Sequence, residues 1–460
     1  MSWDILFATP LFYLIGVCRG TRKKIYWVCC FKLPGMKKYA FLLGSHPLIS
    51  FLEILNILTV EKVPHGSIER MGEILIIQLK LTAAKLNKLQ DILGGTIKII
   101  EIVDDYRGTI FQLDKILTRE NLLNNYFAQH SSKINFGISV YTTKSLVYAE
   151  INWLRNFAYQ LKRRFKDQYS IRYVDEKNFE LSSLMVANNK LVETGAEIVI
   201  IKQEKSFLVG RTRTVQDFRS YAQRDMEKPS PNPKSGMLPP KLAQMLLNLS
   251  RDTGQTQVFD PFCGSGVLLQ EALLLDLDVL GADIDEEAVK DTIENLEWLI
   301  KTYNAAAPKL GQDKIKKISV AGRVRVADAT RSRWEKANQA NTFIATEPYL
   351  GPPQRGPVLI HHAREISAEL EKLYLGFFTN LKKNFSKVRR VGIVFPVIKT
   401  NEGLLYLNIL EDIEKLGYIR RPFLPAEEAK KEALASHRGS LLYSRPDAFV
   451  LREIFVFEKK

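Results

Sequence analysis

Apolar and polar positions alternate in different patterns in the two halves of the chain. In the first half, short apolar runs predict strands at 73–77, 97–102, 136–141, 170–174, 196–203 and 206–209. Apolar residues at helical spacing predict helices at 48–58, 83–93, 151–166 and 182–188. In sequence order, these elements group into two small α+β units.

In the second half, strands alternate with helices from about residue 242 onward. Successive apolar runs end at Asp260, Asp283, Asp328 and Glu347, and amphipathic stretches such as 361–385 accompany them. This alternation is typical of a doubly wound parallel sheet, whose ligands bind at the carboxyl ends of the strands. We therefore expect a Rossmann-like α/β domain in this half.

Changes in composition place the domain boundaries. A proline-rich segment separates the two halves, and proline stiffens such a connection. The expected organisation is a poorly defined extension at 1–35, α+β domains at 36–105 and 106–212, a linker at 213–241 and the α/β domain at 242–460.

The first 35 residues are partly apolar but do not fit a membrane span. The stretch from Ile5 to Cys18 is interrupted by Pro10 and Gly16, and it is shorter than the roughly twenty residues of a spanning helix. Its positive charges follow the apolar core, whereas a secretory signal carries them before it. We expect no membrane association and hypothesise that the functional chain starts at Met36.

A formal net charge of +15 indicates a polyanionic partner, and nucleic acid is the class that it favours. Part of this charge is concentrated on the predicted helix 151–166. Its cations are candidate RNA-binding residues because they are suited to phosphate contacts: Arg155, Lys162, Arg163, Arg164 and Lys166. The alternative is an ordinary solvated helix face.

The cysteines show no paired metal-ligand spacing along the chain: Cys18, Cys29, Cys30 and Cys263. So few cysteines in 460 residues are typical of a protein of the reducing cytoplasm. His361 and His362 lie at a helix start without a third ligand at a suitable spacing. We therefore expect a cytoplasmic protein without a metal site.

The segment from Val258 to Gly266 joins an apolar strand to a helix through an acidic, glycine-rich turn. Its glycines allow a tight turn and a close approach of a ligand, and the helix N-terminus behind them favours an anionic carboxylate. These features predict an S-adenosylmethionine pocket formed by Asp260, Pro261, Gly264, Ser265 and Gly266. A Walker phosphate loop would need Gly-Lys-Ser or Gly-Lys-Thr, which the turn lacks.

Two later acids complete the predicted cofactor site. Asp283 ends the next strand about twenty residues on, where an acid commonly bonds ribose hydroxyls. Capping of the following helix is the alternative role for Asp283, and Asp285 is the stronger candidate for that cap. Asp328 ends the third strand and is expected to accept from the adenine amino group. Cys263, inside the turn, has no evident base partner and is expected only to fill space.

Four sequence blocks together resemble the THUMP-domain RNA methyltransferases, specifically the family that N2-methylates guanosine 10 of tRNA: Arg213–Asp225 with Pro229, Gly236–Ala243, Asp260–Gly266 and Tyr443–Asp447. The resemblance implies an N-terminal ferredoxin-like domain and a THUMP domain that grips the acceptor end of tRNA. It also implies a class I, Rossmann-like methyltransferase domain with a terminal antiparallel strand and S-adenosylmethionine as cofactor.

One motif departs from that family. Its members usually carry Asp-Pro-Pro-Tyr after the fourth strand, where the acid and a backbone carbonyl accept from the target amino group and the aromatic residue stacks on the base. Here the sequence is Glu347-Pro348-Tyr349-Leu350. The resemblance thus places catalysis at Glu347, Pro348 and Tyr349, with Tyr349 as the hypothetical stacking residue.

Three functions remain open from the sequence. The favoured one is tRNA guanine-N2 methylation of a flipped base. The second is methylation of an amino group in rRNA or DNA, and the third is a tRNA-binding protein whose catalytic motif has decayed. The expected partner is tRNA, and the expected state is a monomer. The sequence leaves open whether a small activating subunit is needed, as it is in some relatives.

Overall fold

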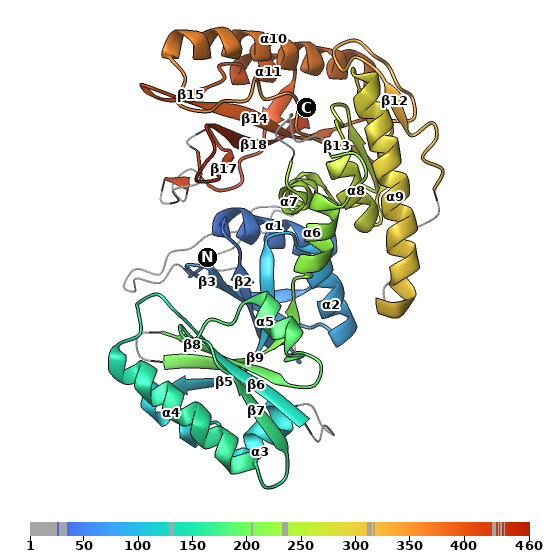
Figure 1. Cartoon of the computed structure of the whole chain (residues 1–460). Coiled ribbons are helices and arrows are strands. Elements are labelled where there is room, and N and C mark those ends of the chain that lie inside the picture. Colours follow the sequence, from blue (N-terminus) through green and yellow to red (C-terminus); the bar gives the residue numbers. More distant parts are fainter. Residues whose placement is uncertain are drawn as a thin grey trace, which may run out of the picture. The chain divides into compact units, whose positions relative to one another are not determined.

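The computed structural model describes residues 25–26, 35–127, 133–203, 206–231, 238–310, 315, 318–425, 429–430, 432, 435–436 and 438–460 (Figure 1). The chain divides into two compact units. Unit 1 comprises Met1–Pro47, Val63–Asp91 and Thr96–Phe218; unit 2 comprises Leu48–Lys62, Ile92–Gly95 and Arg219–Lys460. The predicted extension 1–35 lies outside the described residues, apart from 25–26 and 35.

Unit 1 is built on one mixed sheet of nine strands in the order β1-β3-β4-β2-β5-β9-β8-β6-β7. Its strands are β1 (Ile25–Tyr26), β2 (Lys37–Leu43), β3 (His65–Met71), β4 (Ile74–Leu79), β5 (Thr96–Arg107), β6 (Lys133–Thr142), β7 (Ser170–Val174), β8 (Ala196–Lys202) and β9 (Ser206–Val215). Strand β5 pairs antiparallel with β2 on one side and with β9 on the other. The sheet is therefore continuous across the predicted boundary at 105/106. The names ferredoxin-like and THUMP for the two parts stay predictions.

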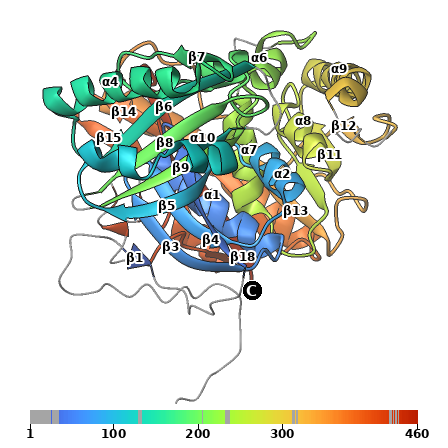
Figure 2. The same ribbon diagram turned by 90° about the horizontal axis from the view of Figure 1, so that it is seen from below.

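Helix α4 (Tyr148–Phe165) covers part of this sheet because its apolar residues fall on one side (Figure 2). Leu154, Phe157 and Phe165 on that side pack into the same core as Phe136 of β6. Shorter elements accompany it: α2 (Ala83–Ile92), the 3-10 helix η1 (Ile110–Lys115), α3 (Arg119–Asn121), the π-helical turn η2 (Leu122–Tyr126) and α5 (Ser183–Asn188).

A buried ion pair crosses the centre of the unit 1 sheet. Lys98 Nζ of β5 lies 2.5 Å from Glu197 Oε1 of β8, and both side chains are at most 1% exposed. Lys98 also donates to the Leu181 carbonyl, and Glu197 accepts from the hydroxyls of Ser139 and Thr212. Several hydrogen bonds thus compensate the loss of hydration of both charges.

Unit 2 contains a sheet with the order β12-β11-β10-β13-β14-β18-β16. Its strands are β10 (Gln257–Asp260), β11 (Asp278–Asp283), β12 (Val324–Val326), β13 (Thr342–Thr346), β14 (Arg390–Thr400), β15 (Gly403–Tyr406), β16 (Tyr418–Arg420), β17 (Leu441–Tyr443) and β18 (Val450–Lys459). The five strands from β12 to β14 run parallel, and β18 pairs antiparallel with β14. The predicted doubly wound sheet with a terminal antiparallel strand is confirmed.

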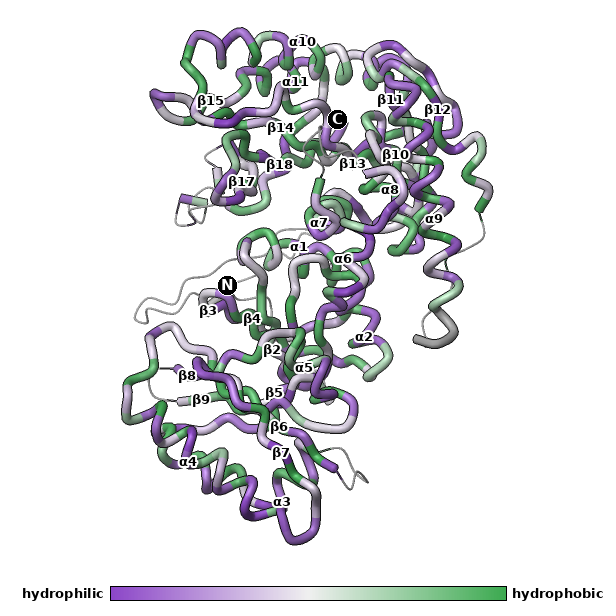
Figure 3. The backbone as a smooth tube through the Cα atoms, in the orientation of Figure 1, coloured by the Kyte–Doolittle hydropathy of each residue, from purple (hydrophilic) through white to green (hydrophobic). Residues whose placement is uncertain are grey.

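Helices cover both faces of this sheet (Figure 1). They are α7 (Pro240–Ser250), α8 (Val267–Leu274), α9 (Glu286–Leu310), α10 (Ile360–Asn384) and α11 (Leu410–Lys415). Unit 2 also contains α1 (Pro47–Val60) and α6 (Phe218–Met226). On one face, Tyr374 and Phe377 of α10 pack into a core with Phe259 and Phe395 of the sheet. Hydrophilic positions alternate with apolar ones along α9, as expected for a helix with one solvent-facing side (Figure 3).

The predicted linker 213–241 is partly regular structure. It contains the end of β9 and the whole of α6. Helix α6 is held within unit 2 by Arg224, which forms a two-point ion pair with the buried Glu271 of α8. Proline content alone concealed this helix, because the contact that stabilises it comes from another part of the sequence. Within the described part of the chain, no helix is long and apolar enough to cross a bilayer.

Candidate functional site

The glycine-rich turn lies between the end of β10 and the start of α8, as the sequence predicts. Gly264 and Gly266 have φ angles of 52° and 80°, in the left-handed region that favours glycine. A Cβ atom added at Gly264 would meet no atom within 4 Å, so the space beside this residue is open. A Cβ at Gly266 would lie 2.9 Å from Thr292 Cγ2, so the turn packs closely against α9.

Two side chains of α9 hold the turn, and no sequence motif points to either of them. The Thr292 hydroxyl donates to the Gly264 carbonyl at 2.6 Å. The Asn295 amide donates to the carbonyls of Ser265 and Ser230, at 2.9 and 3.0 Å. These contacts fix the backbone of the turn and attach the start of the proline-rich segment to it.

Asp260 lies beneath the turn with its carboxylate directed into the protein. Its Oδ1 accepts from the Thr346 hydroxyl at 2.6 Å and from the Phe262 N–H at 3.1 Å. Burial raises the pKa of Asp260 to about 7, with smaller increases from the charges of Asp283 and Glu347, although the two hydrogen bonds lower it. Asp260 therefore ties the ends of β10 and β13 together beneath the turn.

Asp283 is the last residue of β11, and Asp328 follows the neighbouring strand β12. Asp283 accepts from the N–H groups of Gly264 and Asp285, at 2.9 and 3.1 Å, so it shapes the turn. Asp285 accepts from the Glu287 N–H at 3.0 Å, which confirms its predicted role at the start of α9. The pKa of Asp328 is lowered: burial opposes the shift, but hydrogen bonds from Thr330 and the nearby Arg331 outweigh it.

This arrangement fits S-adenosylmethionine. The open space beside Gly264 lies at the N-terminal end of α8, which favours a carboxylate. Asp283 uses each carboxylate oxygen for one backbone bond, and each oxygen retains capacity to accept another, for example from a ribose hydroxyl. Asp328 is anionic and partly exposed at the end of the next strand. Pro261, Ser265 and Gly266 complete the turn.

Cys263 and the histidine pair at 361–362 have the following surroundings. Cys263 is fully buried, and burial raises the pKa of its thiol well above its usual value, so it is not a thiolate nucleophile. His362 contacts Glu365 of its own helix at 3.3 Å. Among the residues that the structure describes, no group of three or more His, Cys, Asp or Glu side chains is placed to hold a metal ion.

The variant motif Glu347-Pro348-Tyr349 follows β13, at the sheet edge where β10 and β11 also end. The Glu347 carboxylate forms an ion pair with Arg452 of β18, with Nε 2.5 Å from Oε2. Pro348 is buried, whereas the Tyr349 side chain is 59% exposed. The Tyr374 hydroxyl of α10 donates to the Tyr349 carbonyl at 2.7 Å. The edge thus offers a fixed carboxylate and an accessible aromatic ring.

The predicted RNA-binding residues lie on α4 and at its C-terminal end, in unit 1. Lys162, Arg163, Arg164 and Lys166 are exposed, and Arg155 is half-buried. Tyr148 and Tyr159 on the same helix are 79% and 52% exposed. At 100° per residue, Tyr148, Arg155, Tyr159, Lys162 and Lys166 fall on one stripe of the helix. Cations and aromatic rings that alternate in this way suit phosphates and unstacked bases.

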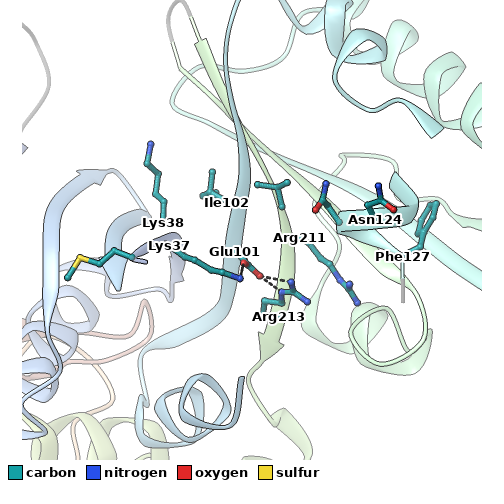
Figure 4. A pocket seen from close by; sticks show the side chains of 11 residues that line it. Lys37, Lys38, Glu101, Ile102, Asn124, Phe127, Arg211 and Arg213 are labelled. Atoms are coloured by element: carbon teal, nitrogen blue, oxygen red, sulfur yellow. Dashed lines mark hydrogen bonds and ion pairs between the residues drawn. The ribbon is translucent and has the colours of Figure 1, made fainter. Parts of the chain in front are cut away.

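A pocket of about 660 Å³ in unit 1 adds a second cationic surface (Figure 4). Its lining includes four cations and one carboxylate: Lys37, Lys38, Arg211, Arg213 and Glu101. Glu101 lies between Lys37 and Arg213, at 2.6 and 2.5 Å, as the dashed lines show. Arg211 is buried, with 8% of its surface exposed, and its Nε has no hydrogen-bond partner among the described residues. Burial, followed by the charge of Arg213, lowers the pKa of Arg211 to about 10. An anion is the ligand that this pocket suits.

Comparison with known proteins finds a methyltransferase domain that resembles the region around the site. Residues 230–352 match the UPF0020 family, an RMKL-like methyltransferase domain. The tRNA (guanine(10)-N2)-dimethyltransferase of Methanocaldococcus jannaschii is 26% identical over 260 residues, which cover 55% of this chain and 69% of that protein. The protein of the same name from Pyrococcus abyssi is 34% identical over 115 residues, covering 25% of this chain and 29% of that protein. The structure of TrmN from Thermus thermophilus aligns at 14% identity with a TM-score of 0.48, over 92% of this chain and 100% of that chain.

The matched residues 230–352 include the glycine-rich turn, the acids at the carboxyl ends of β10, β11 and β12, and the Glu347 motif. The matched region and the geometry therefore concern the same sheet edge, and the expected cofactor, S-adenosylmethionine, is confirmed. The chain is an S-adenosylmethionine-dependent methyltransferase; its residues 230–352 resemble the RMKL-like methyltransferase domain, and its sequence is similar to tRNA (guanine(10)-N2)-dimethyltransferases.

Proposed function

We propose that the protein methylates the exocyclic N2 of a guanosine in tRNA, at position 10. The observation that carries this proposal is the Glu347-Pro348-Tyr349 motif, which follows β13 at the same sheet edge as the glycine-rich turn. The names of the relatives from Methanocaldococcus jannaschii and Pyrococcus abyssi support guanosine 10 as the target. Asp260, Pro261, Gly264, Ser265, Gly266, Asp283 and Asp328 would form or shape the cofactor site.

The chemistry requires alignment more than strong acid or base catalysis. S-adenosylmethionine supplies a methyl group on a sulfonium sulfur. The guanine N2 lone pair is delocalised into the ring, so the enzyme must hold this nitrogen in line with the methyl carbon. The Glu347 carboxylate and the Pro348 carbonyl would accept hydrogen bonds from the amino group. On transfer, the nitrogen would gain the methyl group and lose one proton, which the Glu347 carboxylate would accept and pass to solvent, and the cofactor would leave as its neutral thioether, S-adenosylhomocysteine.

The target base must leave its stack to reach this edge of the sheet. Tyr349 is exposed and would stack on the flipped base. The stripe of cations and tyrosines on α4, called the α4 stripe below, would contact the phosphates of the same tRNA, and so would the cationic pocket of unit 1. The protein would act as a monomer on tRNA in the cytoplasm, with a small activating subunit as a further candidate partner.

The test is transfer of labelled methyl from S-adenosylmethionine to unmodified tRNA, followed by digestion to nucleosides and mass spectrometry. N2-methylguanosine should appear with the wild-type protein and fall by at least about 10²-fold with Glu347→Ala. Glu365→Ala is the matched control, because Glu365 is an exposed carboxylate on α10. Its rate should equal that of the wild-type protein.

The same assay separates the alternatives. Transfer to rRNA or DNA in preference to tRNA would indicate the second candidate function. Binding of tRNA without transfer, in the presence and absence of cell extract that supplies partner subunits, would indicate a binding protein with a decayed site.

A further inference from the structure

Glu347 has a partner from a distant part of the sequence, Arg452. Arg452 Nε lies 2.5 Å from Glu347 Oε2, and its Nη2 lies 3.0 Å from Oε1. Each carboxylate oxygen therefore receives one hydrogen bond from one guanidinium group. This two-point geometry is the strongest and most directional form of a side-chain ion pair.

The position of Arg452 in the fold explains how it reaches the site. In the antiparallel pair of β14 and β18, Arg452 lies opposite Pro396, beyond the part of β14 that pairs with β13. The start of β18 thus lies at the sheet edge where the parallel strands end. The side chains of Arg452 and Glu347 are 8% and 11% exposed, so little water competes for the pair.

The ion pair with Arg452 limits the additional conformational freedom that Glu347 has because its side chain is longer than that of an aspartate. A glutamate has one methylene group and one torsion more than the aspartate of the resembling family, so its carboxylate has more orientations available. The guanidinium restricts the carboxylate to one plane. A carboxylate has about four lone-pair sites, and Arg452 uses two of them, so each oxygen keeps capacity to accept from an amino group.

We propose that Arg452 is a positioning residue for methyl transfer, which fixes the Glu347 carboxylate in the orientation that accepts the target amino group. This inference rests on the proposed function. Nothing in the sequence motif indicates Arg452, because 105 residues separate it from Glu347.

The groups that surround Glu347 determine how its protonation would change if Arg452 were removed. Burial raises the pKa of the hydroxyls of Tyr443 of β17 and Tyr374 of α10, and the negative charge of Glu347 raises it further. Asp260 is a further acid near this site, and the charge of Glu347 contributes to its raised pKa. The guanidinium of Arg445 acts on Tyr443. Without Arg452, the largely buried Glu347 would face two phenols and an acid, and its protonated form would become more favourable.

A protonated Glu347 can no longer accept at both oxygens, so the pH dependence of the rate is the informative measurement. We would compare the wild-type protein with Arg452→Met, Arg452→Lys, Glu347→Gln and the double variant Glu347→Gln/Arg452→Met, in steady-state methyl transfer to unmodified tRNA. Arg421→Met is the matched control, because Arg421 pairs with Glu458 of the same strand β18 at 2.5 Å.

The expected result has four parts. Arg452→Met lowers kcat about 10²-fold with KM for both substrates nearly unchanged. The acid limb of its pH–rate profile moves up by about one pH unit or more. Arg452→Lys restores part of kcat. The double variant is no slower than Glu347→Gln alone, because Arg452 acts only through Glu347. Arg421→Met behaves as wild type.

Two outcomes overturn the inference while the proposed function stands. One is a wild-type kcat and pH profile for Arg452→Met beside an inactive Glu347→Gln. The other is a double variant slowed by the product of the two single effects, since Arg452 would then act independently. If Arg452→Met fails to fold, the double variant, which buries no unpaired charge, supplies the same comparison with Glu347→Gln. A fully active Glu347→Gln would also overturn the inference, because Arg452 is proposed to act only through Glu347. A wild-type protein that methylates no tRNA refutes the proposed function itself.

Discussion

Asp260 binds a proton more tightly in the folded protein than in the unfolded chain. Burial raises its pKa to about 7, against about 3.9 for an exposed aspartate. Below about pH 4 the group is protonated in both states, and between about pH 4 and 7 only the folded protein keeps the proton. The contribution of Asp260 to stability therefore falls as the pH rises through this window, by about 1.4 kcal/mol per pH unit.

The substitution Asp260→Asn removes this titration. We expect the free energy of unfolding of the variant to rise relative to that of the wild-type protein between pH 5 and pH 7, as measured by urea denaturation. Glu53, whose pKa burial also raises to about 7, titrates in both proteins and cancels in the comparison. Parallel pH curves for the two proteins would show that Asp260 ionises normally.

At the residue scale, sequence reasoning predicted the groups whose chemistry is local. The turn from Asp260 to Gly266 can be predicted because the glycines, the acid and the strand-to-helix change are adjacent in the chain. Thr292, Asn295 and Arg452 could not be predicted in this way. Their importance depends on contacts between segments that are distant in sequence, and their residue types are ordinary where they stand.

At the element scale, α9 supports the cofactor turn through the Thr292 hydroxyl. The substitution Thr292→Val keeps the volume of the side chain but leaves the Gly264 carbonyl without this donor. A lost hydrogen bond to a largely buried group costs about 1–3 kcal/mol, so we expect S-adenosylmethionine affinity to fall about tenfold in isothermal titration calorimetry.

Two variants make this experiment specific. Thr292→Ser keeps the hydroxyl and should retain most of the affinity. Asn304→Ala removes a side chain of the same helix that bonds to Ile315 instead of the turn, and its affinity should match that of the wild-type protein. Equal losses in Thr292→Val and Asn304→Ala would mean that α9 acts only through overall stability.

The pattern of apolar residues predicted most of the elements because each of them presents a periodic apolar face of its own. It failed for α6, which the proline-rich surroundings concealed. That helix depends on the buried pair between Arg224 and Glu271 and on a hydrogen bond from Tyr221 to Gln244. A short helix that is stabilised by polar contacts with other segments shows no periodic pattern of apolar residues in its sequence.

At the scale of the whole molecule, the net charge of +15 should appear as salt dependence of tRNA binding. The logarithm of affinity should fall linearly with the logarithm of salt concentration. The double substitution Lys162→Gln/Lys166→Gln should reduce the slope by about 0.7–0.9 for each phosphate that the variant no longer neutralises, in filter binding or fluorescence anisotropy.

The aromatic members of the α4 stripe allow a contrasting measurement. Tyr159→Ala should weaken binding by about 1–3 kcal/mol, with little change in the salt slope, because stacking releases no counterions. Lys290→Gln is the control, since Lys290 is an exposed cation on α9 that pairs with Glu286. A slope that is unchanged in the α4 variants would mean that the stripe is an ordinary solvated helix face.

The continuous sheet of unit 1 constrains how this part of the gene can be inherited. Strand β5 pairs with β2 on one side and β9 on the other, and Lys98 on β5 is the counterion of the buried Glu197 on β8. A recombination event that exchanged only the part before β5, or only the part after it, would bring together strands that had never been selected as neighbours. An exchange that replaced Lys98 would leave a buried carboxylate without its counterion. The gene segments that encode the two parts of the sheet should therefore be inherited together, without recombination between them.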